Sequence, residues 1–306
     1  MSAQTFWFMG TGKFAALCLE GLTRRGVNLS RIITGLPTRS GRNNRENPSP
    51  VEEAATALGL SVTRTGKLTE NPELFREFQA ENPTATFVID FGQIIREPLL
   101  SCLCLNIHPS LLPEYRGAAP IQRALLDGHT HTGVTVFKLV RAMDAGPVVA
   151  QERVEIGPDD NASDLYTRLA EVGCGLAADA LKNPEGLTFT PQDDSRATFA
   201  PKLEKEEFAL SFTMSAEKFT NTVRALDMSG GAYVMVRGRR VKVWRAGVCE
   251  GVKAKTPGQV LDCSGRLIVS CGEGSVELSE VQSEGKNRVS SLDWARGLRL
   301  KTGSSL

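Results

Sequence analysis

Residues 5–25, TFWFMGTGKFAALCLEGLTRR, contain the strand, turn and helix that decide the fold. Thr5–Met9 is a short apolar run typical of a buried strand, and Gly10-Thr-Gly12 follows it as a tight turn. From Lys13 to Arg25 apolar side chains recur at helical spacing, which places them on one face of a helix. A strand that runs directly into a helix is the repeating unit of a parallel α/β sheet.

The same alternation continues through the first 180 residues and predicts a Rossmann-like, doubly wound parallel sheet. Further strands are expected at 29–34, 60–64, 86–91, 102–107, 133–139 and 147–154, and further helices at 51–58, 72–81, 118–126 and 163–181. Residues 35–50, GLPTRSGRNNRENPSP, consist of helix and strand breakers with basic and polar residues between them. They predict a long exposed loop without regular structure.

The pattern changes after residue 185. A polar stretch punctuated by proline comes first, and a helix is then expected at 215–226. Short alternating runs separated by glycines follow at 232–237, 240–246, 258–262, 267–271 and 275–281. Such runs predict a small antiparallel, OB-like barrel. We therefore expect a first domain at 1–187, a linker at 188–206 and a second domain at 207–306.

Composition excludes several classes of protein. The 306 residues are 41% hydrophobic and 23% charged, as in globular proteins. The sequence contains no run of 18 apolar residues, the length that a membrane-spanning helix needs. The first residues lack the basic segment of a signal peptide, which predicts a cytoplasmic protein. Seven cysteines without a CxxC pair predict free thiols and no zinc. Net charge is +1, but residues 204–306 carry 16 basic against 12 acidic groups, a weak indication of a polyanionic partner.

The turn Gly10-x-Gly12-x-x-Ala15 has the spacing of a dinucleotide-binding fingerprint, so a nicotinamide oxidoreductase is one alternative. That function also needs an acidic residue at the end of the second strand to bind the ribose. The second strand ends in Ile33-Thr-Gly-Leu36, with no Asp or Glu. A tight turn without a nucleotide is the favoured interpretation.

A histidine at the end of an apolar strand is the first candidate for chemistry. His129 and His131 lie in a polar turn, whereas Asn106 and His108 end a predicted strand on the same side of the chain. Ligands of open α/β sheets bind at the carboxyl ends of the strands. An amide and an imidazole there can stabilise an oxyanion and transfer a proton. Asp144, before a Gly-Pro turn, either orients the histidine or simply caps the turn.

Three segments carry a resemblance to a known family. They are NIHPSLLPEYRGAAPIQ at 106–122, TGVT at 132–135 and MDAG at 143–146, and together they closely resemble the formyltransferases that use 10-formyltetrahydrofolate. The resemblance implies that the family's catalytic Asn, His and Asp correspond to Asn106, His108 and Asp144. It also implies that the folate contacts correspond to Ser110, Leu111, Leu112 and Pro113, and that no metal is required.

Other segments are similar to the branch of this family that acts on methionyl-tRNA. They are GAAPIQRA at 117–124, TFAPKLEKEE at 198–207 and VKVWRA at 241–246. The resemblance thus covers nearly the whole chain and implies a monomeric enzyme that formylates initiator methionyl-tRNA, with the second domain lying against the tRNA. The 35–50 segment corresponds to the family's loop at the tRNA acceptor arm. Its cations, and the expected tRNA contacts, are Arg39, Arg42 and Arg45.

Two alternatives stay open. A sugar-nucleotide formyltransferase would share the fold, and a non-catalytic RNA-binding OB protein would not need the Asn-His-Asp trio.

The chain departs from the family's pattern at several positions. Gly12-Lys13 stands where Pro-Asp is common, and Asp90-Phe-Gly92 stands where a small residue usually precedes Tyr-Gly. The 35–50 loop has three arginines and no lysine, although it is usually lysine-rich in this family.

Overall fold

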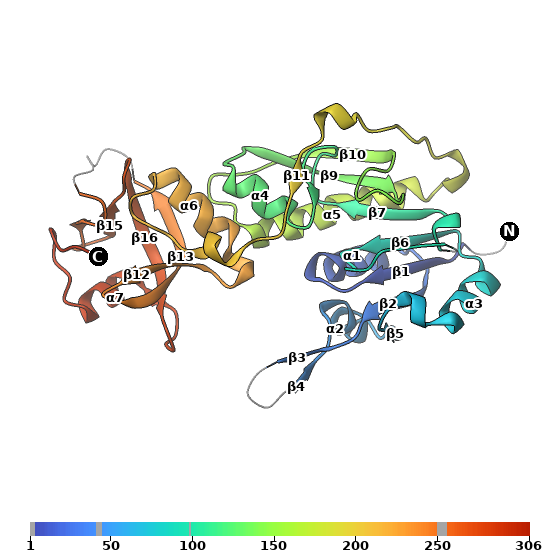
Figure 1. Cartoon of the computed structure of the whole chain (residues 1–306), viewed down its shortest axis with the longest axis horizontal. Coiled ribbons are helices and arrows are strands. Elements are labelled where there is room, and N and C mark those ends of the chain that lie inside the picture. Colours follow the sequence, from blue (N-terminus) through green and yellow to red (C-terminus); the bar gives the residue numbers. More distant parts are fainter. Residues whose placement is uncertain (1–3, 41–44, 98, 250–255) are drawn as a thin grey trace. The chain divides into compact units, whose positions relative to one another are not determined.

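The computed structural model describes residues 4–40, 45–97, 99–249 and 256–306 (Figure 1). These residues form two compact units that interleave along the chain. Unit 1 comprises Met1–Gly117, Thr132–Glu155 and Tyr166–Phe199, and unit 2 comprises Ala118–His131, Ile156–Leu165 and Ala200–Leu306. In the part of the chain that is described, no helix is both long enough and apolar enough to cross a membrane.

Unit 1 contains a seven-stranded sheet in the order β10-β9-β7-β6-β1-β2-β5. Its strands are β1 (Phe6–Gly10), β2 (Leu29–Gly35), β5 (Val62–Thr65), β6 (Ala85–Ile89), β7 (Cys104–His108), β9 (His131–Lys138) and β10 (Val148–Glu155). The pairs among β1, β2, β5, β6 and β7 are parallel, which confirms the doubly wound core. Strand β9 differs from this parallel core, because it pairs with β7 in antiparallel register, His108 opposite Thr135. Strand β9 begins at the same edge of the sheet at which β7 ends, so the connection between them does not cross to the opposite edge as a parallel pair requires.

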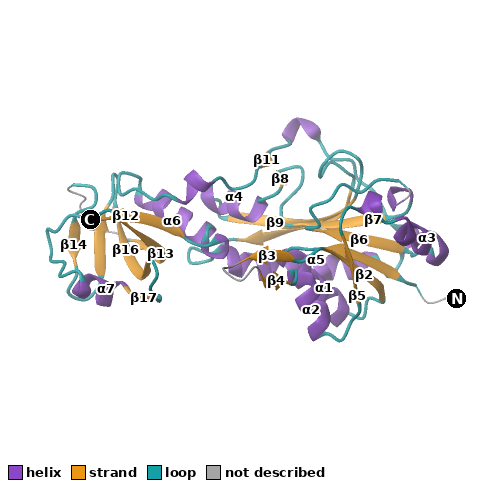
Figure 2. Cartoon of the chain, turned by 60° about the horizontal axis from the view of Figure 1, so that its bottom comes forward, coloured by secondary structure: helices purple, strands orange, loops and turns teal. Residues whose placement is uncertain are grey.

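Helices cover both faces of this sheet. They are α1 (Lys13–Arg24), α2 (Pro50–Ala57), α3 (Pro72–Glu81) and α5 (Ala162–Ala180). Figure 2 shows α1, α2 and α5 together on one face. On the other face Trp7 of β1 packs edge-on against Phe78 of α3, with ring centroids 5.1 Å apart, in a buried apolar cluster. Burying each such large side chain stabilises the fold by about 1.5–3 kcal/mol.

The 35–50 segment has more structure than we predicted. Strands β3 (Thr38–Ser40) and β4 (Arg45–Asn47) form an antiparallel pair, with Arg39 opposite Glu46. The prediction of a loop without regular structure is therefore wrong at these positions, because ladder hydrogen bonds form in a stretch of low strand propensity. Helix α2 then begins at Pro50, and the hydroxyl of Ser49 caps it by accepting from Glu52 N–H at 3.1 Å.

Unit 2 confirms the predicted antiparallel β domain. Its sheet has the order β12-β13-β16-β15-β14, with β17 beside β16. The strands are β12 (Ala232–Val236), β13 (Arg239–Val248), β14 (Val260–Asp262), β15 (Leu267–Ser270), β16 (Ser275–Ser283) and β17 (Val289–Ser290), and the helices are α4 (Pro120–Leu126), α6 (Ala216–Ala225) and α7 (Ser291–Gly297). Within this unit the Arg123 guanidinium of α4 pairs with the Glu207 carboxylate, which lowers the pKa of Glu207.

Short elements complete the chain. Strands β8 (Arg116–Gly117) and β11 (Phe199–Ala200) form a two-stranded sheet. The 3-10 helices are η1 (Leu68–Glu70), η2 (Leu99–Ser101), η3 (Pro184–Gly186), η4 (Asp194–Arg196), η5 (Lys205–Phe208) and η6 (Asp227–Ser229). Four of the cysteines, Cys18, Cys104, Cys174 and Cys271, are buried free thiols.

Candidate active site

Asn106 and His108 lie on β7, the strand at which the sheet changes from parallel to antiparallel pairing. The two residues are on the same side of the strand, as the alternation predicted. His108 is buried at 5% exposure, and its ring packs edge-on against Phe137 of β9. Asn106 is half-buried, and among the described residues its side-chain amide has no hydrogen-bond partner. That amide is free to donate to a ligand.

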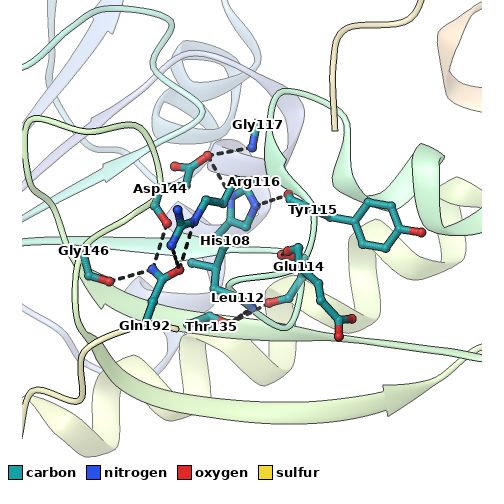
Figure 3. Close-up of polar contacts among 11 residues, drawn as sticks. His108, Leu112, Glu114, Tyr115, Arg116, Gly117, Thr135, Asp144, Gly146 and Gln192 are labelled. Carbon is teal, nitrogen blue, oxygen red and sulfur yellow. Dashed lines mark hydrogen bonds and ion pairs between the residues drawn. The ribbon is translucent and has the colours of Figure 1, made fainter. Parts of the chain in front are cut away.

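Hydrogen bonding defines which nitrogen of His108 carries the proton. The Nε2 atom lies 2.9 Å from the Tyr115 carbonyl oxygen, which can only accept (Figure 3). A neutral ring therefore has its proton on Nε2 and its lone pair on Nδ1. Nδ1 lies 3.9 Å from Asp144 Oδ2, too far for a hydrogen bond but within range of strong electrostatic attraction once the ring is charged. Nδ1 is thus the proton-accepting atom of the pair.

Asp144 occupies a strained turn between β9 and β10. Its φ angle is +51°, a left-handed conformation that non-glycine residues rarely adopt. Oδ2 accepts a hydrogen bond from the Gly117 backbone N–H at 2.8 Å. Two residues later, Gly146 leaves no space for a side chain, since an added Cβ would lie 1.7 Å from the Lys138 carbonyl oxygen. The carboxylate is therefore positioned by its backbone and not by a direct bond to His108.

The predicted folate-contacting segment Ser110–Pro113 follows His108. Ser110 is fully buried and donates its hydroxyl hydrogen to the Glu114 carbonyl at 2.6 Å, so this side chain shapes the loop. Leu112 is also buried, at 4% exposure, whereas Leu111 and Pro113 are partly exposed. Of the four predicted contacts, the side chains of Leu111 and Pro113 are the ones that a ligand can reach.

Two polar side chains of the neighbouring strands fix this segment. The hydroxyl of Thr135 on β9 donates to the Ser110 carbonyl at 2.7 Å and accepts from Leu112 N–H at 3.1 Å. Gln151 on β10 donates to the Leu112 carbonyl at 2.9 Å and to Thr135 Oγ1 at 2.7 Å. The backbone beside His108 is thereby bonded to the sheet at Ser110 and Leu112.

The glycine turn at 10–12 is already occupied by protein groups. Thr11 N–H and Gly12 N–H both donate to the Asp90 carbonyl at 3.1 Å, and the Asp90 carboxyl fills the space beside Gly12. Phe14 N–H, in the first turn of α1, donates to that carboxyl. A phosphate at this helix N-terminus would meet a carboxylate, which argues against a dinucleotide site. Gly12 and Asp90, both departures from the family's pattern, are thus neighbours.

Two of the three predicted tRNA contacts lie on the antiparallel pair of strands β3 and β4. Arg39 lies on β3 and Arg45 on β4, where Arg45 pairs across from Ser40. The side chains of Arg39 and Arg45 are not described. Arg42 lies outside the described residues.

Arg116 and Gln192 complete the site, and sequence reasoning missed both as functional residues. Arg116 is buried at 6% exposure, and Gln192 lies in the stretch that we interpreted as a linker. Gln192 Nε2 donates to the carbonyl oxygens of Asp144 at 2.8 Å and Gly146 at 2.7 Å (Figure 3). No periodicity marks Gln192, because an irregular segment carries no pattern for its long-range contacts.

Among the described residues no group of three His, Cys, Asp or Glu is placed to bind a metal ion.

Two family models match the chain: formyl transferase over residues 5–181, and formyl transferase, C-terminal domain, over residues 202–299. The fold and the two matches together define a formyl transferase.

Curated relatives narrow the class. The chain is 39% identical over 308 residues to the methionyl-tRNA formyltransferase of Methylobacterium sp. (strain 4-46), a match that covers 98% of each chain. It is 36% identical over 304 residues to that of Solibacter usitatus, covering 98% of this chain and 97% of the relative. The chain belongs to the methionyl-tRNA formyltransferase family.

Solved structures agree at the level of the fold. HypX from Aquifex aeolicus in complex with tetrahydrofolic acid has a TM-score of 0.64 at 19% identity, covering 96% of this chain and 46% of that one. This chain therefore spans about half the length of HypX. The methionyl-tRNA formyltransferase from Clostridium thermocellum has a TM-score of 0.56 at 16% identity, covering 82% of this chain and 96% of that one.

Proposed function

We infer that this chain transfers the formyl group of 10-formyltetrahydrofolate to the free amino group of initiator methionyl-tRNA. The observation that carries the inference is the Asn106, His108 and Asp144 arrangement at the carboxyl edge of β7. It occurs in a chain 36–39% identical, over nearly its full length, to enzymes named for this reaction. This function accounts for both a proton acceptor and a free amide donor at one sheet edge.

The chemistry needs a proton acceptor and a stabiliser of negative charge. The amine forms a bond to the formyl carbon, the bond from that carbon to the folate nitrogen breaks, and one proton passes from the amine to the folate nitrogen. His108 Nδ1, which bears the lone pair, accepts the proton, and Asp144 at 3.9 Å stabilises the resulting imidazolium. The Asn106 amide donates to the developing oxyanion, an effect worth roughly 3 kcal/mol. The Nε2 proton is bonded to the Tyr115 carbonyl, so His108 aids the oxyanion through its positive charge.

The folate is a substrate, and the residues present suit it. Leu111 and Pro113 are partly exposed and apolar, beside a histidine whose position is fixed by the sheet. A flat aromatic ligand gains affinity from such apolar contact, while the unpaired Asn106 amide supplies a polar contact. The folate contacts proposed are therefore Ser110, Leu111, Leu112 and Pro113, with the side chains of Leu111 and Pro113 as the direct ones.

The tRNA is proposed to contact the 35–50 segment through Arg42, Arg39 and Arg45. A second contact is proposed on unit 2, where cations lie over aromatic rings. The Arg288 guanidinium carbon is 3.4 Å from the Trp244 ring centroid, and that of Arg240 is 4.1 Å from the Tyr233 centroid. Paired cations and rings suit a polyanion with exposed bases.

The organisation proposed keeps the boundaries expected from the sequence: a catalytic domain at 1–187, a linker at 188–206 and a tRNA-contacting domain at 207–306. The protein is proposed to act as a monomer in the cytoplasm, where charged tRNA is found. Sedimentation of the purified chain, alone and with tRNA, tests the monomeric state.

One assay tests the function. Purified protein is incubated with 10-formyltetrahydrofolate and either methionyl-tRNA or a 4-amino sugar nucleotide, and formylated product is measured. We expect product with methionyl-tRNA alone. Product with the sugar nucleotide alone would show that the acceptor is wrong, and folate and tRNA binding without any product would favour a non-catalytic RNA-binding protein.

A further inference from the structure

Gln192 contacts the backbone on both sides of Ala145, directly after the catalytic aspartate. Its Nε2 atom donates to the Asp144 carbonyl at 2.8 Å and to the Gly146 carbonyl at 2.7 Å (Figure 3). Both hydrogens of one amide are therefore used on the turn that contains Asp144. This turn has an unfavourable φ angle of +51° at Asp144, so it needs support from the surrounding structure.

Arg116 determines how the Gln192 amide is oriented. Its Nε and Nη2 atoms donate to Gln192 Oε1 at 3.1 and 2.7 Å, and Nη2 also donates to Asp194 Oδ1 at 2.7 Å. A guanidinium can only donate, so the amide oxygen must face Arg116 and the NH₂ group must face the turn. The buried Arg116 thus removes the flipped orientation, in which Gln192 could not donate to the Asp144 carbonyl.

The backbone around Arg116 binds the two catalytic groups themselves. The carbonyl of Tyr115 accepts from His108 Nε2 at 2.9 Å, and Gly117 N–H donates to Asp144 Oδ2 at 2.8 Å. This three-residue stretch is in turn bonded to the irregular segment that follows Gln192, since Arg116 N–H donates to the Thr198 carbonyl at 2.9 Å. Residues 115–117 and Gln192 therefore form one connected network that fixes His108 and Asp144 relative to each other.

We propose that Gln192 is a positioning residue for the Asp144 carboxylate, oriented by Arg116, so that one residue of the expected linker supports the catalytic site. The proposal rests on the proposed formyl transfer, because it assigns Asp144 the task of stabilising the His108 imidazolium. Gln192 acts through the backbone of Asp144 and touches neither substrate in this account. A misplacement of the carboxylate by about 1 Å costs roughly 10²-fold in rate.

Gln192→Glu tests the two hydrogen bonds from Gln192 to the turn most directly. It keeps the size of the side chain and its contact with Arg116, but it replaces two N–H donors by a carboxylate oxygen facing two carbonyls. Asp194→Asn is the matched control, because it weakens the other Arg116 contact at an exposed side chain and leaves the Gln192 bonds in place. Gln192→Asn retains the amide on a shorter chain and is the conservative variant.

The measurements are kcat, KM for folate and tRNA, thermal unfolding, and the ring nitrogen NMR signals of His108, in a chain with three histidines. We expect Gln192→Glu to lower kcat by about 10-fold or more, to leave both KM values within about two-fold and to shift the His108 ring signals. Gln192→Asn should recover part of kcat, and Asp194→Asn should stay within about two-fold of wild type.

A folded Gln192→Glu variant with wild-type kcat and unchanged His108 signals would overturn the proposal. Lower thermal stability with unchanged kcat would overturn it as well, since that result assigns Gln192 a purely structural role. The wild-type assay separates this outcome from failure of the proposed function: an inactive wild type contradicts formyl transfer, while the His108 signals still report whether Gln192 positions Asp144.

Discussion

Asp144 Oδ2 lies 3.9 Å from His108 Nδ1, on the side of the imidazole that does not carry its proton. The negatively charged carboxylate interacts weakly with the neutral imidazole and attracts the charged imidazolium more strongly. Asp144 is bonded to Gly117 N–H and held by Gln192 through its own carbonyl, so its position does not depend on the charge state of His108. The pair is thus placed for the proposed proton transfer.

The amide and imidazole on β7 should both be essential to the rate. We predict that Asn106→Ala and His108→Ala each lower kcat by roughly 10²-fold, the usual loss of an oxyanion donor or a general base. Steady-state kinetics of the folded variants checks this, with His129→Ala, an exposed histidine, as the control. Near-normal turnover of either variant would remove that residue from the mechanism.

Gly146 should be irreplaceable for packing reasons. An added Cβ would lie 1.7 Å from the Lys138 carbonyl oxygen, a backbone atom that cannot move aside cheaply. We predict that Gly146→Ala destabilises the protein by about 1–3 kcal/mol, as overpacking does, and lowers kcat by displacing Asp144. In Gly175→Ala, within α5, the nearest atom would lie 3.8 Å away, so that variant should be neutral or gain up to about 1 kcal/mol. Chemical denaturation compares the two, and equal stability would refute the packing argument.

Asp90 should make stability depend on pH. As a residue it is solvent-exposed, but its carboxyl group lies against Gly12 and the start of α1, and burial of this group raises its pKa to about 6 from the usual 3.8. A raised carboxyl pKa means that the ionised form destabilises the fold. The destabilisation is absent below about pH 4, grows through the interval from 4 to 6 and is complete above 6.

Asp90→Asn should therefore raise the Tm relative to wild type, by an amount that increases from pH 4 to 6 and then stays constant. Asp262→Asn should instead lower the Tm by an amount that is nearly constant above about pH 5, because hydrogen bonds from Ser264 lower the pKa of Asp262 and its ionised form stabilises the fold. Melting curves between pH 4 and 8 decide. A Tm difference for Asp90→Asn that does not vary with pH would contradict this assignment.

The 35–50 segment should contact tRNA and not folate. Arginine has forked donors suited to phosphates and base edges, so we predict that Arg42→Ala raises KM or lowers kcat for methionyl-tRNA while folate affinity is unchanged. Arg39→Ala and Arg45→Ala should do less, each reducing the salt dependence by about one unit per lost phosphate contact. Steady-state kinetics across a salt series measures this. Wild-type behaviour of Arg42→Ala at every salt concentration would show that the 35–50 segment does not bind tRNA through Arg42.

Sequence reasoning succeeded where residues carry a local pattern. The strand pattern around Asn106 and His108 predicted β7 within two residues of its observed ends. The spacing of apolar residues predicted helices α1, α3 and α5 with the same accuracy. It failed for β3 and β4, where a loop was predicted, and it gave no direction for β9, since pairing partners are long-range information. Asp144 was ambiguous from the residues alone, and the resemblance was needed to select it.

Gln192 could not be found from the sequence, and the reason is physical. Its role depends on two carbonyls 46 and 48 residues away and on a guanidinium 76 residues away, and no periodic or compositional signal encodes such contacts. The polar composition around it is also that of a solvated linker. Only the folded chain places this amide against the turn that contains Asp144.

The Asp144 carboxylate is proposed to stabilise the protonated His108 during formyl transfer to methionyl-tRNA. The most direct measurement is kcat of Asp144→Asn in that assay, because this substitution keeps the acceptor for Gly117 N–H and removes only the charge. We predict a loss of roughly 10²-fold or more in kcat, with thermal unfolding and folate affinity close to wild type. A folded Asp144→Asn variant that turns over at the wild-type rate would contradict the account.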